Sequence, residues 1–174
     1  CYGFNLEGFE CIATCELLER RIKMQSYNKK CRYDTGYICG DMTKKETQER
    51  ILDQYHFWEK HHHVKDLDVV IATPPCQGMS VANHKKTDET KELKRNSLVV
   101  ESLKMVLTLN PKFFVFENVR SFLTTGCMDI DGEYKAIGDA INQNLGGKYN
   151  IYARVVNFKD YGNLSSRPRT LVLG

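Results

Sequence analysis

The chain has 174 residues, of which 41% are hydrophobic and 27% are charged. A chain of this length and composition folds as one ordinary globular domain, so a disordered segment and a disulfide-stapled miniprotein are excluded. No apolar run comes near the ~20 residues that cross a bilayer, which excludes a membrane-spanning protein. With 25 basic and 22 acidic residues, the net charge of +3 is too small to indicate nucleic-acid binding by itself.

The cysteines and histidines indicate neither a disulfide framework nor a metal site. Seven cysteines is an odd number and includes no CxxC pair, which favours a reducing, intracellular compartment. His61, His62 and His63 follow His56, but adjacent helical residues point in different directions, and no cysteine or carboxylate pair has ligand spacing. We interpret this run as a solvated helix end.

The first part of the chain predicts two steps from strand to helix. The apolar run Cys11–Cys15 is typical of a short buried strand ending at Glu16, and the segment Leu17–Met24 continues as a helix. A second acidic residue, Asp41, follows the segment 37–40.

A capping-box pattern marks the start of the second helix. Thr43 and Glu46 have the S/T-x-x-E spacing of this motif. The apolar face of the predicted helix consists of Ile51, Leu52, Tyr55 and Trp58.

The middle of the chain predicts a buried strand and then a long loop. Residues Leu67–Ala72 do not alternate between apolar and polar side chains, as expected for a strand covered on both sides in a parallel sheet. The pair Pro74-Pro75 follows this strand. From Thr73 to Asn96 the chain is polar without an apolar period. A loop of this length in a compact domain is usually a functional lid or disordered.

The alternation of helices and strands continues to the end of the chain. The predicted elements are helices over Ser97–Leu109 and Tyr134–Leu145 and strands over Lys112–Phe116, Tyr149–Val156 and Thr170–Leu173. The sum predicts an α/β, doubly wound domain with a mostly parallel sheet.

In such sheets, ligands bind beyond the carboxyl ends of the strands. Glu16, Asp41 and Glu117 each follow or end a predicted strand. A carboxylate in the position of Glu16 is a usual acceptor for ribose hydroxyls, which suggests a nucleoside-containing cofactor. The alternative is a surface acid at a helix start, where the helix dipole favours negative charge.

Cys76 follows Pro74-Pro75, so a stiff turn presents its thiol at a strand end. For a lone cysteine, an inert packed thiol is the more common outcome. Glu117 ends another strand, and a thiol with a carboxyl group that can share a proton suits attack on an activated heterocycle.

Three segments closely resemble core motifs of the cytosine-5 DNA methyltransferases, in family order and at family-like spacing. The segments are Asp68–Ser80 with its Pro-Cys-Gln turn, Glu117-Asn118-Val119, and Arg167-Pro168-Arg169 after Asp160-Tyr161-Gly162. The resemblance covers nearly the whole chain. It implies a sheet of the class I S-adenosylmethionine-dependent methyltransferase type and transfer of a methyl group to C5 of cytosine.

The resemblance implies a role for each catalytic residue. Cys76 would bond covalently to cytosine C6. The protonated carboxyl group of Glu117 would donate a hydrogen bond to N3 and accept one from the exocyclic amine as charge develops. Arg169 would contact O2, and Arg167 would support the glutamate or the backbone. Because these atoms are not reachable in a stacked duplex, the base would be flipped out of double-stranded DNA.

The resemblance also assigns binding residues. The predicted substrate-binding residues are Gln77, Ser80 and Asn118, and the predicted cofactor-binding residues are Glu16, Leu17, Asp41, Met42, Pro75 and Leu98. The loop from Gln77 to Asn96 is similar to the family's mobile catalytic loop. Its basic side chains Lys85, Lys86, Lys91, Lys94 and Arg95 would meet phosphates or stay solvated.

The chain departs from the family pattern in three respects. Ser165 replaces a usual glutamine, the glycine-rich cofactor loop is expected just before Cys1, and a target-recognition domain is expected beyond Gly174. We therefore expect residues 1–174 to be part of a catalytic domain and to be inactive alone.

The resemblance favours a monomeric, cytoplasmic modification enzyme of a bacterial or phage restriction-modification system. Two other functions remain open. They are a tRNA cytosine-5 methyltransferase with the same core and a catalytically silent homologue that acts as a binding module.

Overall fold

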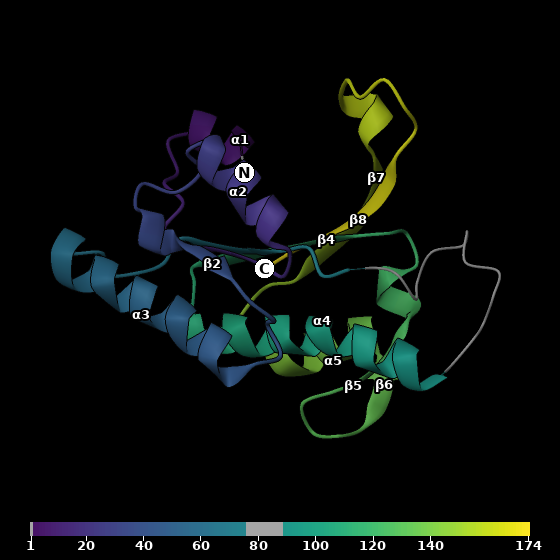
Figure 1. The fold of residues 1–174 in the computed structure, drawn as a ribbon. Helices are drawn as coiled ribbons and strands as arrows, with labels where there is room; N and C mark the ends of the chain where they lie inside the picture. Colours follow the sequence, from purple (N-terminus) through teal and green to yellow (C-terminus); the bar gives the residue numbers. More distant parts are fainter. Residues whose placement is uncertain (1, 76–88) are drawn as a thin grey trace. The chain divides into compact units, whose positions relative to one another are not determined.

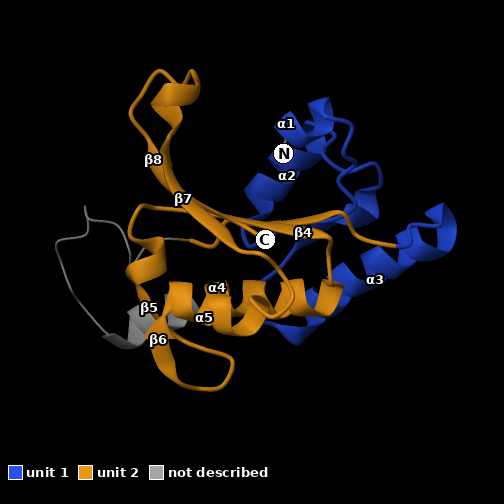
Figure 2. Ribbon diagram, turned by 180° about the vertical axis from the view of Figure 1, so that it is seen from behind, with its two compact units in different colours: residues 1–65 blue, residues 66–174 orange. Residues whose placement is uncertain are grey.

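A computed structural model describes residues 2–75 and 89–174 of the chain, and residues 89–97 by their backbone alone. The chain divides into two compact units, Cys1–Lys65 and Asp66–Gly174, coloured separately in Figure 2. None of the described helices is long and apolar enough to cross a membrane.

The first unit is built around a pair of short parallel strands. Its elements are α1 (Tyr2–Leu6), β1 (Thr14–Glu16), α2 (Glu19–Tyr27), η1 (Asp34–Gly36), β2 (Tyr37–Cys39) and α3 (Lys45–His62). In the β1–β2 ladder, Thr14 pairs with Tyr37 and Glu16 pairs with Cys39. Both strands therefore end at the same edge of the pair. Glu16 ends β1, as the sequence predicted.

The start of α3 differs from the prediction of a capping box at Thr43, which is wrong. Lys44 is the N-cap residue, and no side chain caps the helix there. The Thr43 hydroxyl instead donates to Asp41 Oδ1 at 2.9 Å.

The second unit contains a four-stranded mixed sheet. Its elements are β3 (Val69–Ala72), α4 (Glu89–Leu109), β4 (Phe113–Asn118), η2 (Phe122–Thr124), β5 (Gly126–Met128), β6 (Tyr134–Ala136), α5 (Ile137–Leu145), β7 (Tyr152–Asn157), η3 (Phe158–Tyr161) and β8 (Pro168–Leu173). The strand order is β3-β4-β8-β7. β3 and β4 are parallel, whereas β8 runs antiparallel to both of its neighbours.

Helices α4 and α5 lie along one face of this sheet (Figure 1). Alternate side chains of β4, Phe114 and Phe116, point to that face and are fully buried against Leu103 of α4. Ile141 of α5 and Val172 of β8 belong to the same cluster. Burial of apolar surface at about 25 cal/mol per Å² makes this cluster the main source of the unit's stability.

The α/β class with parallel strand pairs and intervening helices is confirmed. The closing strands are antiparallel additions to the parallel pair. Two boundaries were wrong: α4 begins at Glu89, inside the predicted loop, and residues 134–136 form strand β6 before α5 begins. β3 was expected to be covered on both sides, but Ile71 is 37% exposed.

Candidate active site

A carboxylate and a guanidinium group meet where β4 ends and β8 begins. In the antiparallel ladder Glu117 lies opposite Leu171, so Arg169, two residues earlier, is on the same face. Arg169 Nε and Glu117 Oε1 form an ion pair at 3.0 Å. The two side chains are 18% and 26% exposed. The pair is thus held by the sheet and remains accessible to a ligand.

Asn118 connects the end of β4 to the proline turn that follows β3. Its side chain is only 3% exposed, and its Nδ2 donates to the carbonyl of Pro74 at 3.0 Å. Its Oδ1 accepts the backbone N–H of Val119 at 2.9 Å. Asn118 therefore fixes the turn from which Cys76 follows. The predicted contact between Asn118 and the substrate stays a prediction.

The predicted nucleophile and two predicted substrate-binding residues lie outside the described residues. These are Cys76, Gln77 and Ser80. The structure places the end of β3 and Pro74 next to the end of β4. It thus brings together the two strand ends from which the sequence predicts the nucleophile and the acid.

The two arginines of the Arg-Pro-Arg motif have different surroundings. Arg167 is exposed, and its side chain has no hydrogen bond or ion pair with the described part of the chain. Its backbone N–H donates to Asn157 Oδ1 at 2.9 Å. The resemblance implied that Arg167 supports the glutamate or the backbone, which stays a prediction. In this structure the residue that forms an ion pair with Glu117 is Arg169.

Asn157 was not predicted, and it holds the base of the segment between β7 and β8. Its Oδ1 also accepts the backbone N–H of Lys159 at 3.2 Å, and its Nδ2 donates to Ser166 Oγ at 3.0 Å. The sequence feature that could have indicated this role is an asparagine at a strand end before a turn. In that position an asparagine side chain commonly forms hydrogen bonds with the backbone.

In the first unit, Glu16 and Asp41 lie at the carboxyl end of the β1–β2 pair. The backbone N–H of Gly40 donates to the Glu16 carbonyl at 3.1 Å, which ties the two strand ends together. The Glu16 carboxylate accepts from Arg21 Nη1 at 3.1 Å and from the backbone N–H of Leu18 at 3.3 Å. Arg21 is 60% exposed, so this pair is weak and exchangeable.

Asp41 is held as a carboxylate. Its Oδ1 accepts both the backbone N–H and the hydroxyl of Thr43 at 2.9 Å. These hydrogen bonds, the backbone one first, lower the pKa of Asp41 from its ordinary value. Asp41 is therefore an acceptor at neutral pH.

The remaining predicted cofactor residues are distributed over both units. Leu17 is exposed and Met42 is half-buried beside Asp41. Pro75 and Leu98 belong to the second unit. Among residues 2–75 and 89–174, no cluster of histidine, cysteine and acidic side chains has the arrangement of a metal site.

The described histidine run belongs to the end of α3. His62 Nε2 lies 2.9 Å from the Tyr33 hydroxyl, and its ring packs on Trp58 at 4.3 Å between centroids. His61 and His63 are exposed. These histidines therefore lie at the end of α3, where the ring of His62 is packed against its neighbours.

Comparison with known proteins identifies relatives along the whole chain. The sequence profile of the C-5 cytosine-specific DNA methylases matches residues 1–174. The type II methyltransferase M.DdeI of Desulfomicrobium norvegicum is 33% identical over 173 residues, which is 99% of this chain and 37% of the relative. The type II methyltransferase M1.HgaI of Avibacterium volantium is 26% identical over 98% of this chain and 45% of the relative.

Two solved structures share the fold. The S. pombe Dnmt2 methyltransferase matches with a TM-score of 0.64 at 15% identity, covering 99% of this chain and 46% of that one. A putative DNA modification methyltransferase encoded in an E. coli prophage matches with a TM-score of 0.58 at 21% identity, covering 96% and 40%. The chain spans less than half the length of each of these four proteins.

Proposed function

Because the chain belongs to the family of C-5 cytosine-specific DNA methylases, we propose that the protein containing it methylates C5 of cytosine in double-stranded DNA. The methyl donor is S-adenosylmethionine, which supplies an electrophilic methyl group on a sulfonium. The observation that carries the proposal is the Glu117–Arg169 pair at the end of β4, beside the turn that Asn118 holds at Pro74.

The residues of the first unit fit the nucleoside part of the donor. Glu16 and Asp41 share one strand edge, and both present carboxylate oxygens. Glu16 would accept the ribose hydroxyls after exchanging its exposed partner Arg21, and Asp41 would accept the adenine amino group. Leu17, Met42, Pro75 and Leu98 would supply apolar contacts.

The reaction begins with addition of the Cys76 thiolate to cytosine C6. This addition moves electron density toward N3, where Glu117 provides a hydrogen bond and a proton, and leaves C5 nucleophilic. After the methyl group is transferred to C5, a base removes the C5 proton. The electron pair of that C–H bond re-forms the C5–C6 double bond and expels Cys76 as a thiolate, and the proton on N3 returns to Glu117.

Arg169 orients the carboxyl group of Glu117 in this scheme. Its Nε holds one carboxylate oxygen, and its guanidinium carries further N–H donors for the cytosine O2. The flipping of the base costs a few kcal/mol, which contacts of Gln77, Ser80 and the basic residues 85–95 with the DNA would offset.

The names of the curated relatives favour DNA over tRNA as the substrate, because M.DdeI and M1.HgaI are both type II methyltransferases. These names also support a role in modification beside a restriction endonuclease. We further propose that the protein acts in the cytoplasm and as a monomer. A silent binding module would not need the Glu117–Arg169 pair.

The test is covalent trapping by the full-length protein. DNA containing 5-fluorocytosine blocks loss of the C5 substituent, so methyl transfer should leave a protein–DNA adduct that survives denaturation. Cys76→Ser should remove the adduct, while Cys127→Ser, at a buried position of β5, should retain it. If Cys76→Ser forms the adduct as the unaltered protein does, the assignment of the nucleophile is wrong.

A parallel assay decides the substrate. Tritium from labelled S-adenosylmethionine should appear in mixed-sequence double-stranded DNA and not in unmodified tRNA. Transfer to tRNA alone would replace DNA as the substrate, and transfer to neither would support the silent homologue.

A further inference from the structure

Two cysteines of the first unit lie side by side on neighbouring segments. Cys11 and Cys31 form an isolated parallel β-bridge, and their Sγ atoms are 3.6 Å apart. Cys31 is only 6% exposed, whereas Cys11 is half-buried. The Cys31 thiol is also within 3.7 Å of the Gly36 carbonyl, and Cys11 Sγ is 3.4 Å from the Ala13 carbonyl.

Close packing keeps the two sulfurs together. A Cβ added at Gly36 would lie 2.7 Å from the Ile12 carbonyl oxygen and 3.1 Å from the Cys31 Cβ. Only glycine therefore fits where η1 passes Cys31. Neighbouring strands are about 4.8 Å apart, within the range of Cα separations of about 4.4 to 6.8 Å that a disulfide bridges.

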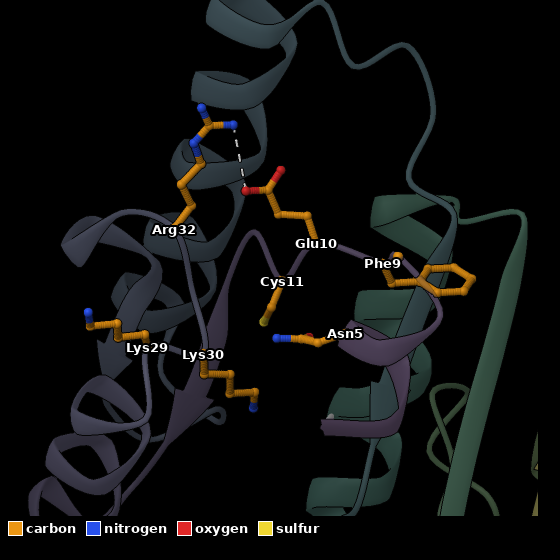
Figure 3. A pocket seen from close by; sticks show the side chains of 8 residues that line it. Asn5, Phe9, Glu10, Cys11, Lys29, Lys30 and Arg32 are labelled. Carbon is orange, nitrogen blue, oxygen red and sulfur yellow. Dashed lines mark ion pairs between the residues drawn. The ribbon is translucent and has the colours of Figure 1, made fainter.

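Cys11 is reachable from solvent through an open pocket. Figure 3 shows the Cys11 side chain among Asn5, Phe9 and the basic residues Lys29 and Lys30. The pocket has a volume of about 390 Å³, ample for a small oxidant. Lys30 is fixed there, because its Nζ donates to Thr14 Oγ1 at 2.8 Å and to Gln25 Oε1 at 3.2 Å.

The surroundings favour a thiolate on Cys11. The hydrogen bond from Cys31, followed by the positive charge of Lys30, overcomes burial and lowers the pKa of Cys11 to about 7. The same shared proton and burial raise the pKa of Cys31. By contrast, burial raises the pKa of Cys15 and of Cys127 to about 11, so these thiols stay protonated and unreactive.

We propose that Cys11 and Cys31 form a redox-active dithiol, which a hydroperoxide converts into an intramolecular disulfide. The Cys11 thiolate attacks the terminal peroxide oxygen, breaking the O–O bond and giving a sulfenic acid and hydroxide. Cys31 then attacks that sulfur, the S–O bond breaks and water leaves. The proton of Cys31 and the proton released when Cys11 ionises both end on the two oxygen atoms of the peroxide. In sum, two thiols and one hydrogen peroxide give one disulfide and two waters.

The disulfide is independent of the methyl-transfer site. It would join the segments that precede β1 and β2, at the opposite end of the strand pair from Glu16 and Asp41. The proposal therefore holds or fails whether or not the protein methylates DNA.

Peptide mapping after oxidation tests the proposal on the 174-residue chain. The reduced chain is treated with hydrogen peroxide in tenfold excess, its remaining thiols are alkylated, and it is digested with trypsin and a glutamate-specific protease. The expected product is peptide 11–16 linked to the dipeptide 31–32, 2 Da lighter than the reduced pair. It should disappear after reduction and account for most of Cys31.

Variants identify the sulfur atoms involved. Peptide 11–16 also contains Cys15, so the linked product must persist in Cys15→Ser and be absent from Cys11→Ser. Recovery of Cys11 and Cys31 as alkylated thiols in the oxidised, unaltered chain would overturn the proposal. So would a stable sulfenic acid on Cys11 without a disulfide, or a linked product that requires Cys15.

Discussion

At the scale of single residues, the atoms that Glu117 leaves available determine what the site can do. Arg169 Nε holds Oε1, whereas Oε2 has no hydrogen bond within the described part of the chain. A carboxyl group held at one oxygen can present the other oxygen in a fixed direction, which is what proton donation to a ring nitrogen requires.

Glu117→Gln should slow methyl transfer by the full-length protein roughly 10²- to 10⁴-fold, the usual contribution of a positioned general acid. Glutamine keeps the shape and still accepts from Arg169 through its amide oxygen, but it cannot supply the proton. Single-turnover rates with Glu133→Gln, an exposed position of the β5–β6 connection, provide the control. An unchanged rate for Glu117→Gln would remove this residue from the mechanism.

At the scale of elements, apolar runs and their flanking residues predicted several strand ends correctly. Glu16 ends β1, and Glu117 lies at the end of β4. Strand β6 was missed because residues 134–136 become a strand only by pairing with β5. The first two turns of α4 were missed because they lack an apolar period.

The contacts of the candidate site depend on pairing between distant parts of the chain. Arg169 meets Glu117 only because β8 is registered against β4 with Leu171 opposite Glu117. The bond between Asn118 and Pro74 requires β3 beside β4. Local sequence patterns predicted which residue types stand at the strand ends, but the register that brings them together is not encoded locally.

Asn118→Ala should lower the free energy of unfolding by about 1 to 3 kcal/mol, because the Pro74 carbonyl and the Val119 N–H lose a buried partner. Urea unfolding measures this change. Asn163→Ala, at an exposed site after η3, should stay within about 0.5 kcal/mol of the unaltered chain. An equal, small effect of both substitutions would show that Asn118 does not hold the turn.

The β5–β6 hairpin should show acid sensitivity through Asp131. The hydrogen bond from Lys135, 2.6 Å from Asp131 Oδ2, is the main cause that lowers the pKa of Asp131 to about 2. Because the folded-state pKa is depressed, this stabilisation is present above the ordinary pKa of 3.8 and is lost as pH falls toward 2.

Asp131→Asn should therefore lower the thermal midpoint at pH 6, with a deficit that shrinks as the pH falls from 4 toward 2.5. Asp160→Asn, which changes an exposed carboxylate of η3, is the control. A deficit for Asp131→Asn that does not vary with pH would contradict the ion-pair explanation.

At the scale of the whole molecule, the sheet of the second unit is covered unequally. Helices α4 and α5 bury the face that carries Phe114 and Phe116. The opposite face, which also carries Glu117 and Arg169, leaves several large apolar side chains exposed in the described structure. These are Ile71, Phe113, Tyr152 and Leu173. An apolar surface of this kind promotes association.

Phe113→Thr should reduce binding of an apolar dye and self-association of the 174-residue chain, with little change in thermal midpoint, because Phe113 is 64% exposed. Its neighbour provides a matched contrast. Phe114→Thr removes a fully buried ring and should cost about 3 to 5 kcal/mol. Sedimentation velocity and calorimetry distinguish the two effects; unchanged association in Phe113→Thr would show that this face is not adhesive.

The hydrogen bond from Asn118 to Pro74 also has a consequence for the order in which the protein folds. It joins residues 44 positions apart in the chain, so it forms only after β3 and β4 have found each other, a slow step for parallel strands. The proline turn that precedes Cys76, the proposed nucleophile, is therefore set late. A nascent or partly folded chain would therefore lack this fixed turn until β3 and β4 have paired.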